Sequence, residues 1–92
     1  MLLAQIVRIP AAGVRDFQEF ESRVLPLLPH YGGALERRLR GDDGRFEVHV
    51  VSFASDDGLQ RYLVDPQRVA ALALLEASGA RAELVEVLDV PT

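Results

Sequence analysis

His49 is the residue of this sequence best suited to proton transfer. It lies in the run Phe46–Phe53, FEVHVVSF, whose β-branched and aromatic residues predict a strand. Because side chains alternate along a strand, His49 shares a face with Glu47 and Val51. An imidazole titrates near neutral pH, so His49 could move a proton on a bound phenol or enol if this face lines a cavity. The alternative is a partly buried structural histidine, hydrogen-bonded to a neighbouring strand or to a carboxylate at a subunit interface.

Three further side chains are candidates for substrate binding: Gln5, Arg37 and Tyr62. Gln5 and Arg37 lie in predicted strands and join His49 only if the strand register brings their faces together, since a slip of one residue reverses every side chain. In a cavity, Arg37 could pair bidentately with a carboxylate or an enolate. Its alternative role is that of a solvated arginine on an edge strand. Tyr62 could donate a hydrogen bond into a pocket, or pack in the core with its hydroxyl group at the surface.

Other reaction types lack a sequence motif. The two histidines, His30 and His49, are nineteen positions apart and there is no cysteine, so no spacing predicts a metal site. The segment Gly41–Gly44, GDDG, lacks the further oxygen ligands of a calcium loop and is typical of a turn. There is no nucleophile elbow, P-loop or dinucleotide-binding fingerprint. We therefore expect neither a metal nor a cofactor.

Length and composition predict one globular domain that spans residues 1–92. The chain has 49% hydrophobic and 26% charged residues, which is within the range of ordinary globular domains. Its net charge of −4 disfavours nucleic acid as a partner, because such binding depends on basic surfaces. No run approaches the roughly 20 apolar residues of a membrane span, and the first residues lack the pattern of a signal peptide. The expected location is the cytoplasm, with no membrane partner.

Four strands are predicted along the chain. The first is Leu2–Ile9, which ends at Pro10. The segments Ala34–Arg40 and Phe46–Phe53 flank the GDDG turn and predict a hairpin. The last strand is expected at Ala82–Val90.

A helix is predicted between the first two strands. Apolar residues recur at spacings of three and four from Phe17 to Tyr31, which indicates an amphipathic helix. Pro26 lies within this pattern and cannot donate a backbone hydrogen bond, so we expect a kink near Ser22 or an early end. Gly32 and Gly33 are typical of the end of the helical segment.

Two further helices are predicted after the hairpin. Ser55 is a candidate N-cap of a short helix, and Asp65 followed by Pro66 predicts a second helix start. The helix that follows, Gln67–Ser78, contains an almost unbroken apolar run. A helix that is apolar nearly all round is usually buried on more than one side.

The order of these elements, βαββαβ, predicts a ferredoxin-like α+β fold. Right-handed crossovers place both helical segments on one face of a four-stranded antiparallel sheet. The other face remains bare and shows apolar residues from the first, third and fourth strands, which is unusual for a soluble monomer. We therefore expect a homodimer in which two sheet faces pack together around a two-fold axis.

Several segments give the chain a resemblance to a known superfamily. They are Phe17–Phe20 (FQEF), Val24–Pro26 (VLP), Tyr31–Gly33 (YGG), Val51–Ser55 (VSFAS) with Leu59 and Tyr62, and the pair Asp65-Pro66. With these segments the chain resembles the dimeric α/β-barrel superfamily, which includes antibiotic-biosynthesis-monooxygenase-like and DUF1330-like small proteins. The resemblance implies a dimeric α/β barrel in which two sheets face each other and enclose a site for a hydrophobic organic ligand. It also implies cofactor-independent chemistry.

The function predicted from these observations is binding of a hydrophobic or aromatic small molecule, with monooxygenase-, cyclase- or isomerase-like chemistry as an option. The alternative is a non-catalytic ligand-binding or regulatory module, such as an ACT-like sensor, which has the same order of elements. A third interpretation is a protein whose main role is to form the dimer itself. Since one fold supports many functions, the sequence leaves open whether the protein is an enzyme.

Overall fold

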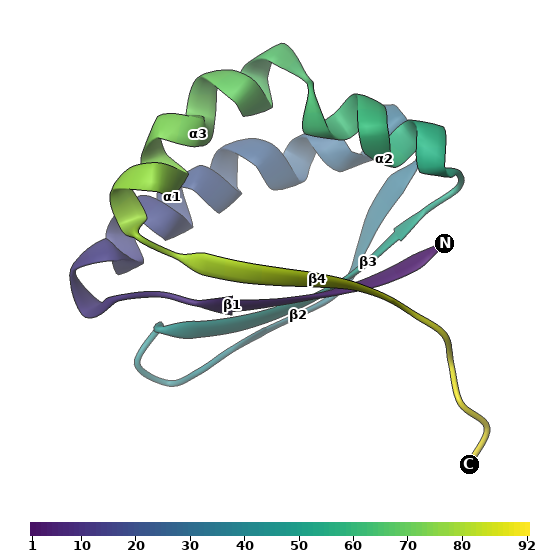
Figure 1. Cartoon of the computed structure of the whole chain (residues 1–92), viewed down its shortest axis with the longest axis horizontal. Coiled ribbons are helices and arrows are strands. Elements are labelled where there is room, and N and C mark those ends of the chain that lie inside the picture. Colours follow the sequence, from purple (N-terminus) through teal and green to yellow (C-terminus); the bar gives the residue numbers. More distant parts are fainter.

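Four antiparallel strands form one sheet in the order β2-β3-β1-β4, and all helices lie on the same side of it (Figure 1). The computed structural model describes residues 1–92. The strands are β1 (Leu2–Arg8), β2 (Gly33–Arg40), β3 (Phe46–Phe53) and β4 (Arg81–Val87). The helices are α1 (Val14–Val24), α2 (Asp56–Leu63) and α3 (Pro66–Ser78), with 3₁₀ segments at Ala11–Gly13 and Leu25–Tyr31. The predicted ferredoxin-like α+β fold is thus confirmed.

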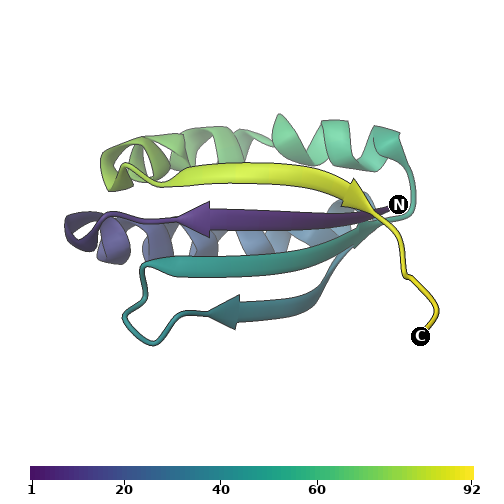
Figure 2. The same ribbon diagram turned by 60° about the horizontal axis from the view of Figure 1, so that its bottom comes forward.

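The end of β4 differs from the prediction. It was expected at Val90, but the strand ends at Val87, after which the chain leaves the sheet (Figure 2). Val87 pairs with Leu2, the first residue of β1. The residues beyond Val87 therefore have no neighbouring strand with which to form backbone hydrogen bonds.

The early end predicted for the first helix is confirmed. The α-helix stops at Val24, and the chain continues as the 3₁₀ segment Leu25–Tyr31, which contains Pro26 and Pro29. Gly32 then adopts a left-handed conformation with φ of 70°, which favours glycine because it has no Cβ atom.

Both predicted helix caps are present. The Ser55 hydroxyl accepts a hydrogen bond from the Gly58 amide at 3.1 Å, at the start of α2. One Asp65 carboxylate oxygen accepts from the amides of Gln67 and Arg68 at 2.7 and 3.2 Å. These bonds satisfy amide groups that have no partner within the helix.

The prediction that α3 is buried on more than one side is wrong for this chain. Only Ala71 and Ser78 of the helix are buried, whereas Val69 and Leu72 are 50% and 37% exposed. α3 packs on α1 from one side, and the fold has no third layer to cover its outer surface (Figure 1). None of the three helices is long and apolar enough to cross a membrane.

The two faces of the sheet differ in their surroundings. The face under the helices carries buried residues such as Leu3, Val7 and Phe53, which pack on α1, α2 and the 3₁₀ segment before β2. We call the opposite side the open face. Its apolar residues, placed by strand alternation and register, include Leu2, Ala4, Ile6, Leu39, Phe46, Val48, Val50, Val85 and Val87. The bare apolar face expected from the sequence is therefore present in the single chain.

Candidate functional site

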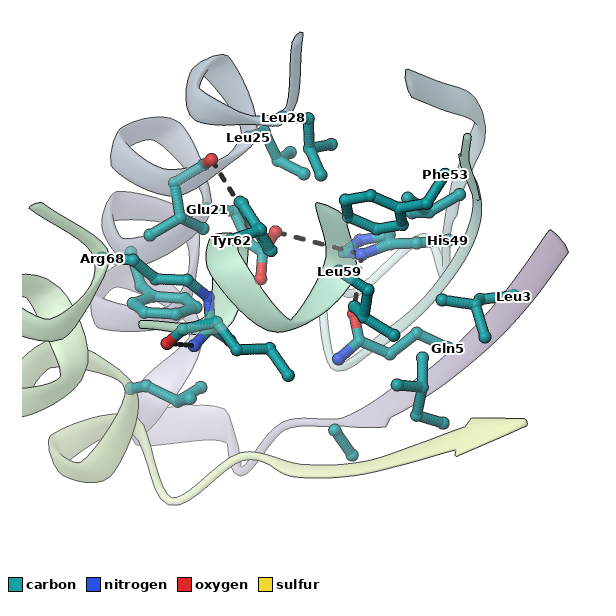
Figure 3. A pocket seen from close by; sticks show the side chains of 17 residues that line it. Leu3, Gln5, Glu21, Leu25, Leu28, His49, Phe53, Leu59, Tyr62 and Arg68 are labelled. Atoms are coloured by element: carbon teal, nitrogen blue, oxygen red, sulfur yellow. Dashed lines mark hydrogen bonds and ion pairs between the residues drawn. The ribbon is translucent and has the colours of Figure 1, made fainter. Parts of the chain in front are cut away.

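A cavity of about 90 Å³ lies between the sheet and the helices (Figure 3). Thirteen of its seventeen lining residues are hydrophobic, so it suits an apolar molecule. Its wall at the sheet edge is formed by Ala82 and Leu84 of β4. Leu84 is 49% exposed, so this wall of the cavity borders the solvent.

His49 lies at the floor of the cavity, on the face of β3 that turns toward the helices (Figure 3). Its side chain is only 1% exposed. The Nε2 atom is 2.8 Å from Oε1 of Glu47, and Nδ1 is 3.3 Å from the side-chain oxygen of Gln5. Gln5 reaches this position because it stands directly opposite His49 in the register of β1 and β3.

Glu47 is fully buried and is held by two arginines from the edge strand β2. Arg38 Nε donates to one carboxylate oxygen at 2.7 Å, and Arg40 Nε donates to the other at 3.0 Å. Burial alone would raise the pKa of Glu47, but the hydrogen bonds from Arg38, His49 and Arg40 outweigh it and hold the pKa below its usual value. Glu47 is therefore a carboxylate at neutral pH, with its buried charge compensated by arginine.

The environment of His49 fixes its protonation state. Burial lowers the pKa of His49, and this effect exceeds the opposing influence of Glu47, so the imidazole is neutral at pH 7. Because the Glu47 carboxylate can only accept a hydrogen bond, Nε2 carries the imidazole hydrogen. Nδ1 therefore presents a lone pair beside Gln5. An amide offers both a donor and an acceptor, so rotation of the Gln5 amide can serve either protonation state of Nδ1.

Glu21 of α1 is a fourth polar member of the site and was not predicted. Its carboxylate is 3.9 Å from Nδ1 of His49, and the residue is 5% exposed. Burial raises the pKa of Glu21 from 4.5 to about 7; the charge of Glu47 acts in the same direction, and Arg38 opposes it. The signal in the sequence was its position four residues after Phe17, on the apolar side of the helix.

Arg37 is not brought to this site. Leu35 pairs with Val51, and uninterrupted pairing would have placed Arg37 opposite His49. A β-bulge between Leu35 and Arg37 shifts the register, so Arg37 pairs with Val50, on the open face, and is exposed. Arg38 takes the position opposite His49 instead.

Tyr62 of α2 does line the cavity (Figure 3). Its hydroxyl group is not at the surface but donates to the backbone oxygen of Val24 at 3.3 Å. Burial raises the pKa of Tyr62, so the hydroxyl stays protonated at neutral pH. Of the four residues predicted for the site, the fold thus gathers His49, Gln5 and Tyr62 around one cavity.

The position of the cavity differs from the one that the superfamily resemblance implied. That resemblance placed a ligand chamber between the facing sheets of two subunits. His49 and the cavity lie instead under the helices, on the opposite side of the sheet from the open face. No group of three or more His, Cys, Asp or Glu side chains is arranged to hold a metal ion.

These features define the class of the chain as a ferredoxin-like α+β protein with a polar cluster beneath its helical layer. No family model matches the sequence, and no curated protein matches it significantly. Solved structures, however, match over nearly the whole chain, so the comparison rests on the fold.

The solved structures include oxygenases. SnoaB, a cofactor-independent oxygenase from Streptomyces nogalater, is 17% identical with a TM-score of 0.72, over 97% of this chain and 93% of SnoaB. An antibiotic biosynthesis monooxygenase is 9% identical with a TM-score of 0.71, over 97% of this chain and 100% of the other. A dimeric ferredoxin-like protein of unknown function from Jannaschia sp. is 18% identical with a TM-score of 0.68, over 95% and 100%. The chain thus has the fold of antibiotic biosynthesis monooxygenase-like proteins, as its resemblance indicated.

Proposed function

We propose that this chain is a cofactor-independent protein that takes a hydrophobic or aromatic small molecule into the cavity beneath its helices and transfers a proton through His49. The observation that carries the proposal is the arrangement of His49: a neutral imidazole, oriented by the buried Glu47, at the floor of a largely apolar cavity. The description of SnoaB as a cofactor-independent oxygenase supports it by analogy of fold.

His49 would act as a general base through Nδ1. The Nε2–H bond to Glu47 holds the ring in one tautomer, and the carboxylate stabilises the imidazolium that forms when Nδ1 takes a proton from a phenol or an enolisable carbon. Arg38 and Arg40 keep Glu47 ionised during this step. The lowered pKa of His49 means that the base form predominates at neutral pH. The enolate or phenolate produced is the reactive species for oxygenation, isomerisation or cyclisation.

The proposal includes a homodimer formed through the open face. Apolar residues of β1, β3 and β4 lie there side by side, with Val85 and Val87 exposed in the single chain. Covering this face with a second copy would remove it from water, and a two-fold arrangement is the simplest way to do so. The dimeric ferredoxin-like protein from Jannaschia sp. supports this arrangement by analogy of fold.

Proton abstraction is measurable without knowledge of the natural substrate. Phenylacetone, a small aromatic ketone, is incubated with the protein in D₂O, and exchange of its acidic hydrogens is followed by ¹H NMR. We expect exchange above the buffer rate, and His49→Gln should lower the enzymatic rate by about 100-fold or more. The rate should rise with pH through a pKa below 6.5, since the neutral imidazole is the active form, and should show a second change near pH 7, where Glu21 ionises 3.9 Å from Nδ1.

The control is His30→Gln, because His30 is exposed and does not line the cavity. This variant should exchange phenylacetone at the wild-type rate. Backbone NMR spectra of both variants establish that they are folded. Equal exchange rates for folded His49→Gln and the wild type would refute the role of His49.

A further inference from the structure

Arg68, in the first turn of α3, places a cation at the helix side of the cavity (Figure 3). Its Nη1 donates to the backbone oxygen of Leu63 at 3.3 Å. Its Nε is buried and has no hydrogen-bond partner. It is the only buried side-chain nitrogen or oxygen atom of the protein without one. A buried donor without an acceptor is destabilising and is uncommon in native proteins. The hydrogen-bonding capacity of this guanidinium is therefore not fully used within the protein.

Two aromatic rings hold the guanidinium group in place. It lies 5.2 Å from the ring centre of Tyr62 and 5.8 Å from that of Phe20. Nη1 is engaged by Leu63, and the guanidinium also interacts with the Tyr62 hydroxyl, where it opposes the rise in the pKa of that group. Nε is enclosed by protein atoms, so Nη2 is the nitrogen that remains for a ligand. A guanidinium N–H donates a strong, charge-assisted hydrogen bond to a carboxylate oxygen.

No acidic side chain of the protein forms an ion pair with Arg68. Asp65, the nearest acidic residue along the chain, is bonded to Tyr31 and to backbone amides at the start of α3. Glu21 also lines the cavity, but burial favours its uncharged form and raises its pKa to about 7. Arg68 therefore has no ion-pair partner within the protein, although its charge acts on Glu21 and opposes the rise of that pKa.

We propose that the ligand of this cavity is a small organic carboxylate whose acid group binds the guanidinium of Arg68 and whose apolar body fills the rest of the cavity. This inference rests on the proposed function and specifies the chemical class of its ligand. The cavity is smaller than the engineered cavity of about 150 Å³ that holds benzene, so it takes a short branched chain as it stands and a single ring only if a lining side chain moves. The half-exposed Leu84 at the sheet edge is the side chain that must move to admit a ring.

Benzoate and benzamide test this inference, because they share a shape but only benzoate carries a charge. Binding is measured by NMR titration, with the methyl signals of cavity residues such as Leu59 and Leu3 as reporters. We expect the wild type to bind benzoate about tenfold more tightly than benzamide. Arg68→Gln should remove this preference and leave benzamide binding within about twofold. Arg68→Lys, which keeps the charge but not the planar guanidinium, should be intermediate.

Arg61→Gln is the matched control. Arg61 also lies over a tyrosine ring, that of Tyr31, but it is exposed and outside the cavity. It should bind both probes as the wild type does.

Three results would overturn the inference. If benzamide and benzoate bind equally well and shift the cavity signals, the carboxylate preference is refuted while the proposed function stands. If benzoate shifts only signals of surface arginines, the assignment of Arg68 is refuted. If neither probe shifts the cavity signals at millimolar concentration, the cavity does not take up single-ring ligands, and both proposals fail. The comparison of the two probes on the wild type does not depend on the folding of any variant.

Discussion

Replacing Glu21 by glutamine should make the stability of this protein less dependent on pH. Glu21 is buried beside His49, and its pKa rises from 4.5 to about 7 because burial disfavours the carboxylate. The folded state thus binds this proton more tightly than the unfolded chain does. The resulting stabilisation is present in full below pH 4.5 and is lost as the pH rises through about 7.

The size of the effect follows from the pKa. Each tenfold change in acidity is worth about 1.4 kcal/mol, so a rise from 4.5 to about 7 corresponds to about 3 kcal/mol. Glutamine has the shape of glutamic acid but never ionises. Glu21→Gln should therefore exceed the wild type in free energy of unfolding by about 3 kcal/mol at pH 8 and by less than about 1 kcal/mol at pH 5.

Urea unfolding followed by circular dichroism at pH 5, 6, 7 and 8 measures this difference. The protein concentration is kept constant, because association would change the apparent stability. Glu19→Gln is the control: Glu19 lies on the same helix, but its side chain is 51% exposed and pairs with Arg23. Its replacement should change the free energy of unfolding by less than about 0.5 kcal/mol at every pH.

A constant difference between Glu21→Gln and the wild type from pH 5 to 8 would show that Glu21 ionises as in water. A variant that is less stable than the wild type at pH 8 would show that the carboxylate is stabilised by Arg38. Either result would refute the view that burial dominates the pKa of Glu21 and would weaken the description of the site as a water-poor cavity.

Two further predictions concern the open face and a helix cap. Val48→Asp puts a charge on the open face between Leu39 and Ile6, so it should convert a wild-type dimer into a monomer in sedimentation experiments. The control Val69→Asp, on the outer side of α3, should leave the dimer intact. A wild-type monomer at micromolar concentration would contradict the proposed dimer. Asp65→Ala should lower the free energy of unfolding by about 1–2 kcal/mol, because it removes the cap of α3 and the partner of Tyr31. An unchanged urea midpoint would contradict the role of this cap.

Local signals in the sequence were sufficient for the elements and their order. Pro26 ends α1, and Ser55 and Asp65 begin α2 and α3, because each acts on backbone groups only a few residues away. The alternation of Glu47 and His49 also placed both on one face of β3. These features depend on chain geometry alone.

The parts that were missed depend on distant contacts. The β-bulge that turns Arg37 away from His49 arises in the pairing of β2 with β3, and the alternation of residues does not reveal it. Glu21 is the exception: its position four residues after Phe17, on the apolar side of α1, was a local signal that the prediction did not use, whereas Glu19 faces water. The apolar run of α3 likewise predicted burial that a two-layer fold does not provide.

A single layer, the β-sheet, separates the cavity from the open face. Along β3, His49 turns toward the helices, whereas its neighbours Val48 and Val50 turn the other way. If a second copy twists this strand when it binds, it also tilts the imidazole. The affinity of the two subunits for each other and the affinity of the cavity for its ligand would then influence each other. By thermodynamic reciprocity, a ligand bound beside His49 would change the affinity of the dimer by the same factor as dimerisation changes the affinity for the ligand.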